Sequence, residues 1–109
     1  MFIVTDNPTF THTVEAHVPT DGGFEIQKFK VTYNLVAGEE FEAFDLSTRE
    51  GSSDLLRKVI ASIGDLVDAE RNPVPYSDAI REKVIRLPWA RRAIVKGYFD
   101  AVNKEAEGN

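Results

Sequence analysis

The sequence predicts an α+β fold: a small N-terminal antiparallel β-hairpin sheet followed by three to four packed α-helices. In the first third of the chain, apolar and polar residues alternate around a glycine-rich turn, as they do in half-buried strands. In the remainder, apolar residues recur at helical spacing between capping residues and prolines. With 109 residues, the chain is expected to form a single domain, 1–109, with a core of its own.

The hairpin region is expected over residues 11–35. Its turn falls at residues 20–23, where the sequence Thr-Asp-Gly-Gly supplies glycines that reach positive φ at little energetic cost. Before the turn, Val14, Ala16 and Val18 alternate with polar residues, so one face of this strand is apolar.

The second strand of the hairpin changes the parity of its apolar residues. Phe24 and Ile26 are even-numbered, whereas Phe29 and Val31 are odd-numbered, so a flat strand would place the two groups on opposite faces. A bulge or register break near Gln27-Lys28 would bring them to the same face. Alternatively, the strand is continuous and both faces become covered, one by the domain's own helices and one by a partner.

Four helices are expected after the hairpin, over residues 39–46, 53–67, 77–87 and 88–104. Ser53 and Ser77 precede apolar residues at helical spacing and are expected to cap the second and third of these helices. Pro88 suits the first turn of a helix, so the last helix is expected to begin there. The expected core comprises Val14, Val18, Val31, Leu56, Val59, Ile60, Ile80, Val84, Ile94 and Tyr98.

The last helix is apolar over more than one face. Apolar or small residues occupy roughly 240° of its circumference on ideal geometry, so more than one neighbour must cover it. Its small-residue side, which allows another element to approach closely, comprises Ala90, Ala93, Gly97 and Ala101. Either a compact fold buries the whole helix, or the flank of Val95, Phe99 and Val102 binds a partner. With Phe24 and Ile26 in the hairpin, these three are the expected partner-binding residues.

The residues do not predict an enzyme, and no catalytic, cofactor-binding or metal-binding site is expected. His12 and His17 differ by five positions, which on a strand sends them to opposite faces and prevents chelation of one metal ion. The sequence has no nucleophile elbow, phosphate loop or dinucleotide fingerprint. The chain is therefore expected to act by binding.

Charge and composition also limit the partners. The formal net charge of -5 argues against nucleic acid, because binding phosphates requires a positive field across a face. The chain lacks cysteine, and no apolar run is long enough for a signal peptide or a membrane span. These features predict a cytoplasmic protein that does not bind membranes.

Several short motifs follow one another in a particular order. They are "PTF", "VPTDGG", "FKVTY", an amphipathic helix, "DAERNPVPYS" and "RLPWARRAIVKGYFDAVNKEAEGN". In this order they resemble the tail assembly chaperones of phages and prophages, and the likeness covers nearly the whole chain. The sequence differs from that pattern at two positions. Ile63 stands where a tryptophan is expected, and Arg71 replaces the glycine usual in the turn before Asn72.

The resemblance implies a function in the cytoplasm of a bacterial host. Proteins of this family bind the tape-measure protein, keep its apolar helical segments from aggregating, help recruit tail-tube protein, and are absent from the mature virion. Two alternatives stay open: a small structural virion protein, such as a tail terminator or head-tail connector, and a generic α+β interaction module. A homo-oligomer is compatible with each of them.

Overall fold

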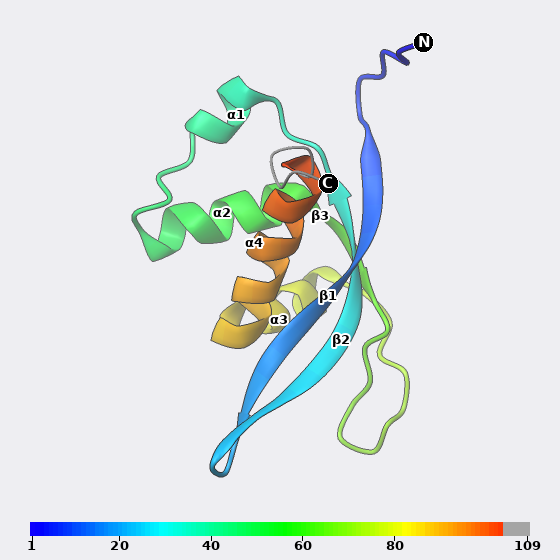
Figure 1. Cartoon of the computed structure of the whole chain (residues 1–109), viewed down its shortest axis with the longest axis vertical. Helices are drawn as coiled ribbons and strands as arrows, with labels where there is room; N and C mark the ends of the chain where they lie inside the picture. Colours follow the sequence, from blue (N-terminus) through cyan, green and yellow to red (C-terminus); the bar gives the residue numbers. More distant parts are fainter. Residues whose placement is uncertain (104–109) are drawn as a thin grey trace.

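The computed structural model describes residues 1–103 and has the expected α+β architecture. The elements are β1 (Thr9–Thr20), β2 (Gly23–Asn34), α1 (Gly38–Glu42), α2 (Arg49–Val59), β3 (Ile60–Gly64), α3 (Asp78–Arg86) and α4 (Pro88–Val102). The strands form one antiparallel sheet in the order β1-β2-β3. The helices lie on one side of this sheet, as Figure 1 shows.

The hairpin is regular along its whole length. Its register runs without a shift from Thr9↔Asn34 to Thr20↔Gly23, and Gly22 in the turn has a φ of 79°. The expected bulge near Gln27-Lys28 is therefore wrong. The continuous strand instead places the two apolar groups of β2 on opposite faces, because the side-chain period of a strand is two.

A third strand replaces the second half of the expected helix over 53–67, and this prediction is wrong beyond Val59. Ile60 and Ile63 are three residues apart, a spacing that also suits a helix. In the structure they pair with Tyr33 and Val31, and a register shift between Thr32 and Tyr33 lets both face the core. A bulge of this kind adds one residue on one strand, so side chains three apart share a face.

The start of α2 also differs from the prediction. Thr48, not Ser53, is the N-cap, and its hydroxyl accepts a hydrogen bond from the N–H of Gly51 at 2.9 Å. Ser53 is buried inside the helix, where its Oγ accepts a hydrogen bond from Nη2 of Arg91 at 2.7 Å. Nη1 of Arg91 donates to the carbonyl of Ile85 at 2.9 Å. One side chain of α4 thereby ties together the α2 helix and the end of α3.

The remaining helices follow the prediction more closely. The first is shorter than the expected 39–46. Ser77 caps α3 as expected, accepting a hydrogen bond from the N–H of Ile80 at 3.1 Å. Pro88 opens α4, which ends at Val102 with Asn103 as its C-cap, and residue 104 of the expected helix lies outside the described residues.

An ion pair holds α3 against α2. Nη2 of Arg57 lies 2.8 Å from a carboxylate oxygen of Glu82, and Nε of Arg57 donates to both oxygens at 3.1 Å. These hydrogen bonds lower the pKa of Glu82 to about 2, and Arg81 contributes to the shift. The ion pair thus connects α3 to α2.

Most of the expected core is confirmed. Seven of the expected residues are buried: Val14, Val31, Leu56, Val59, Ile60, Ile94 and Tyr98. Other buried apolar residues are Ala16, Phe29, Tyr33, Leu55, Ile63, Ile85, Ala90 and Ala93. The prediction is wrong for Val18, Ile80 and Val84, which stay partly exposed, although Val18 and Val84 pack against the core.

The loop between β3 and α3 contains a backbone position that favours glycine. Arg71 has a φ of 66°, in the left-handed region. The carboxylate of Asp68 holds the turn, because it accepts hydrogen bonds from the N–H groups of Glu70 and Asn72, each at 2.9 Å. The side chain of Arg71 is exposed and makes no ion pair within residues 1–103.

We expect Arg71→Gly to stabilise the protein by about 0.5–1 kcal/mol, because glycine removes the strain of the left-handed residue and loses no contact. Urea denaturation of both proteins measures the difference. Arg71→Ala is the matched control, since it also removes the side chain but keeps the Cβ, and it should leave the free energy of unfolding within about 0.5 kcal/mol. Equal stabilisation by both variants would show that backbone strain at Arg71 is not the cause.

A buried tyrosine links β2 to α4. The side chain of Tyr33 is fully buried, and its hydroxyl donates a hydrogen bond to the carbonyl of Ile94 at 2.7 Å. Burial raises the pKa of Tyr33 well above its ordinary value, and the carboxylate of Asp100 adds to the shift. The folded protein therefore keeps this phenol neutral at pH values at which an unfolded tyrosine ionises.

This difference makes stability depend on pH in the alkaline range. Since the folded pKa is raised, the stabilisation is complete below about pH 10 and is lost above it, by about 1.4 kcal/mol per pH unit. Tyr33→Phe should be less stable at pH 8, by about 0.5–1.5 kcal/mol from the lost hydrogen bond. Its stability should then fall less steeply than that of the wild type between pH 10 and 11.5. Parallel slopes in urea denaturation across this range would refute the assignment to Tyr33.

Candidate functional site

An apolar groove opens beside the distal half of the hairpin. Its volume is about 350 Å³. The sheet supplies its floor, the loop after β3 supplies one rim, and α3 with the first turn of α4 supplies the other. The groove is lined by Ala16, Val18, Gln27, Phe29, Leu66, Val67, Val74, Ile80, Lys83, Val84, Leu87, Trp89 and Ala90.

The groove exists because the hairpin is longer than the layer that covers it. The third strand pairs with β2 only over residues 30–33, so the distal half of β2 has no neighbour on that side. In its place the loop after β3 folds back on itself, with the N–H of Val74 bonded to the carbonyl of Leu66 at 2.8 Å. Residues of this loop and of α3 both line the groove.

Three residues that were predicted to be buried in the core instead lie on the surface of the groove. Val18, Ile80 and Val84 are the expected core residues that stay partly exposed, and all three line the groove. Val67 and Leu87, on the two rims, are 57% and 41% exposed. The sequence therefore places core-type side chains around a space that the described residues leave open, which indicates a binding surface.

The chemistry of the groove favours apolar ligands. Only Gln27 and Lys83 among its lining residues carry polar side chains, and both are exposed. Lys83 makes no ion pair with another described residue, so its ammonium group can receive a carboxylate at the rim. The lining side chains are therefore suited to apolar contacts with a ligand.

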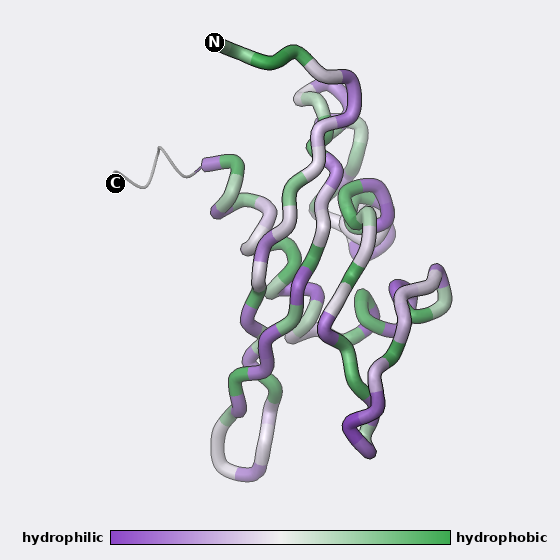
Figure 2. Tube along the Cα trace, turned by 90° about the vertical axis from the view of Figure 1, so that its right-hand side faces the viewer, coloured by the Kyte–Doolittle hydropathy of each residue, from purple (hydrophilic) through white to green (hydrophobic). Residues whose placement is uncertain are grey.

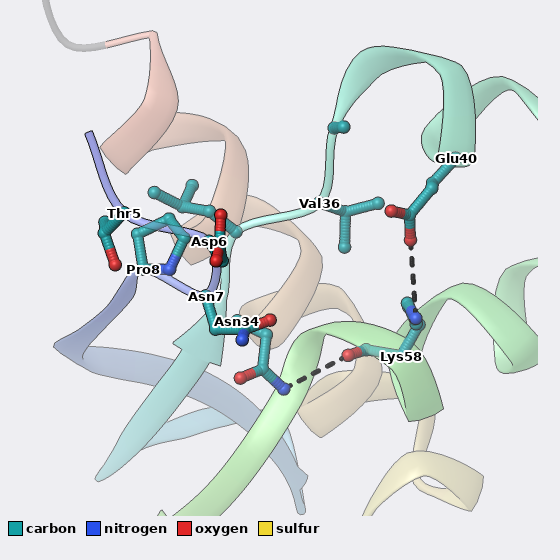
Figure 3. A pocket seen from close by; sticks show the side chains of 10 residues that line it. Thr5, Asp6, Asn7, Pro8, Asn34, Val36, Glu40 and Lys58 are labelled. Atoms are coloured by element: carbon teal, nitrogen blue, oxygen red, sulfur yellow. Dashed lines mark hydrogen bonds and ion pairs between the residues drawn. The ribbon is translucent and has the colours of Figure 1, made fainter.

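A second, polar cleft of about 540 Å³ lies at the other end of the sheet. Figure 3 shows its lining side chains, among them Asp6, Asn34, Glu40 and Lys58. The ammonium group of Lys58 pairs with Glu40 at 3.4 Å, and Asn34 Nδ2 donates to the carbonyl of Lys58 at 3.3 Å. These contacts join β2, α1 and α2. Because Glu40, Lys58 and Asn34 bind one another, this part of the cleft connects secondary-structure elements of the fold.

The hairpin residues expected to bind a partner lie at the tip of the hairpin, on the face away from the helices. Phe24 and Ile26 are 60% and 50% exposed. The ring of Phe24 stacks on His17 with ring centres 4.7 Å apart. The continuous strand, which the sequence analysis gives as the alternative to a bulge, places these residues on the face opposite Phe29 and Val31. The structure does not bring them together with the groove.

The flank of α4 divides into two parts. Val95 and Phe99 are partly buried and pack against the core, and the ring of Phe99 meets that of Phe41 edge-on at 5.6 Å. Val102 is 43% exposed. The fold therefore covers part of the flank with α1, and only Val102 offers an open apolar side chain. None of the three lines the groove.

The titratable residues do not converge. His12 and His17 lie on opposite faces of β1, as expected, and both are exposed. Within residues 1–103 no group of three or more histidine, aspartate or glutamate side chains could hold a metal ion. In the same part of the chain, no helix combines the length and apolar character needed to cross a bilayer.

No protein-family model matches the chain, and neither a curated protein nor a solved structure matches it. The sequence did not predict the groove because its rim residues Leu66 and Val67 were assigned to the expected helix over 53–67. A usable signal was present in the same segment. The apolar residues between Asp65 and Pro75 stand in a stretch rich in aspartate, asparagine and proline, which is typical of loops.

Proposed function

We propose that this protein is a phage or prophage tail assembly chaperone that binds apolar helical segments of the tape-measure protein in the groove. In this function it would assist assembly of the tail tube and would leave before the virion is complete. The observation that carries the proposal is the open groove lined by core-type side chains. The order of motifs along the chain supports the family.

The shape of the groove suits a helix as its client. The groove is lined by the sheet, by a loop and by helical residues, nearly all of them apolar. Amphipathic helices bind apolar grooves through side chains spaced three and four residues apart. Lys83 at the rim would pair with an acidic residue on the polar side of the client helix. A net charge of -5 would keep the loaded complex soluble.

The groove also suits temporary binding. Its volume of about 350 Å³ is at the small end of the usual range for ligand pockets, about 300–1,000 Å³, so it accommodates few side chains. Contacts of this size favour rapid release, which a protein that leaves the finished particle requires. A virion connector would remain, and mass spectrometry of purified particles separates the two functions.

A charge placed in the groove should abolish client binding without unfolding the protein. We expect Val67→Glu to weaken binding at least tenfold, because the client would have to bury an unpaired carboxylate. The client is an apolar helical fragment of the tape-measure protein that we expect to be encoded just downstream. Light scattering measures how well each variant prevents its aggregation.

Leu46→Glu is the matched control. Leu46 is 44% exposed but lies between α1 and α2, away from the groove. It should suppress aggregation as the wild type does, and both variants should keep the wild-type melting temperature, since each changes an exposed side chain. Equal suppression by Val67→Glu and Leu46→Glu would overturn the assignment of the client to the groove.

A further inference from the structure

A second apolar surface stands apart from the folded body. The segment Met1–Val4 has four consecutive apolar residues, and each is at least 84% exposed. Figure 2 shows this segment as a hydrophobic stretch at the end of the molecule opposite the hairpin tip. A soluble protein rarely leaves such a run uncovered, because burying each large side chain is worth about 1.5–3 kcal/mol.

Two side chains of the segment, those of Ile3 and Val4, cannot reach the groove of their own chain. The carbonyl of Pro8 accepts a hydrogen bond from the N–H of Leu35 at 3.0 Å, which fixes the backbone there. Ala16, the nearest residue of β1 in the groove, lies eight residues further, or about 26 Å along the strand. Fully extended, the chain from Val4 to Pro8 spans about 14 Å, and from Ile3 about 18 Å. Both side chains therefore fall short of the groove.

We propose that the groove of one copy binds the segment Met1–Val4 of a second copy. The groove then has a resident occupant whenever no client is present. This inference rests on the proposed function only in its regulatory part, the competition between the segment and the client. The association of two copies stands on the structure alone.

The chemistry of the two surfaces is complementary. Phenylalanine, isoleucine and valine side chains match a groove lined by valine, leucine, isoleucine and tryptophan. The first carboxylate after the segment is that of Asp6, which makes no ion pair within residues 1–103. Lys83 on the groove rim is likewise unpaired there. A segment entering the groove would bring these two opposite charges to the same rim.

The hairpin tip is the other apolar candidate within the chain. Its exposed large hydrophobic residues are only Phe24 and Ile26, and Phe24 already stacks on His17. The tip is also held in a continuous two-stranded ladder, so it cannot change shape to enter a groove. Met1–Val4 precedes the first strand and is free of that constraint. The segment Met1–Val4 is therefore a better occupant of the groove than the hairpin tip.

Directed cross-linking tests the proposal in a chain that lacks cysteine. Two populations with different affinity tags are mixed, one carrying Ile3→Cys and the other carrying Val67→Cys or Leu87→Cys on opposite groove rims. A disulfide forms only if the two Cα atoms come within about 7 Å. Under mild oxidation, we expect at least one rim position to give tenfold more mixed dimer than Leu46→Cys, which is equally exposed but distant.

Sedimentation of the cysteine-free protein gives an independent readout. The wild type should self-associate as concentration rises, and both Ile3→Asp and Val67→Glu should be monomeric at concentrations at which Leu46→Glu still associates. The proposal is overturned if Ile3→Cys cross-links no better to the rims than to the control position. Preferential cross-linking of the rims to Phe24→Cys would also overturn it, in favour of the hairpin tip.

Client binding separates this inference from the proposed function. Ile3→Asp leaves the groove intact, so it should bind the tape-measure fragment at least as tightly as the wild type and should lose only self-association. If Ile3→Asp also fails to bind the tape-measure fragment, the segment does not compete with the client, and the proposed regulation is refuted. If the groove rims cross-link to Ile3→Cys but no variant changes binding of the tape-measure fragment, the self-association is supported and the proposed chaperone function is refuted.

Discussion

The contact between α4 and the sheet at Tyr33 is the constraint on which the rest of the structure depends. The Tyr33 hydroxyl bonds to the carbonyl of Ile94, and Gly97 lies one turn further along the helix. A Cβ on Gly97 would stand 2.6 Å from Val14 and 2.7 Å from the Tyr33 oxygen. Only a residue without a side chain allows this approach, because contacts that short do not occur in packed interiors. The small-residue side of the helix thus fixes both its distance from the sheet and its position along it.

The groove follows from where this contact lies. Docking at Gly97 places the first turn of α4, with Trp89 and Ala90, against the sheet about two turns away, beside the distal part of the hairpin. Arg91 in the second turn then fixes α2 and the end of α3 through hydrogen bonds to Ser53 and Ile85. The connection at Leu87 keeps α3 in contact with α4, and α3 forms one rim of the groove.

The sequence predicted the parts of the fold that local chemistry decides. The hairpin turn, the Ser77 cap and the start of α4 at Pro88 each depend on residues next to one another in the chain, and all three are confirmed. The third strand was missed because Ile60 and Ile63 have helical spacing, and only pairing with β2 across a bulge shows them to be a strand. The site was missed for a related reason. The periodicity of the sequence marks Val18, Ile80 and Val84 as core-type positions. Whether other elements cover these side chains depends on how the whole fold packs.

The two open apolar surfaces of the hairpin share one cause, the length of its strands. Each strand has twelve residues, whereas β3 pairs with only four residues of β2. A hairpin that extends beyond its neighbours exposes both faces near the tip, and a two-stranded hairpin is marginally stable without cover. Here the face toward the helices becomes the floor of the groove, and the other face carries Phe24 and Ile26. Shortening the strands would remove both surfaces and leave the Tyr33 contact intact. The core uses the proximal half of the hairpin and Ala16, whereas the residues nearer the tip stay partly or fully exposed.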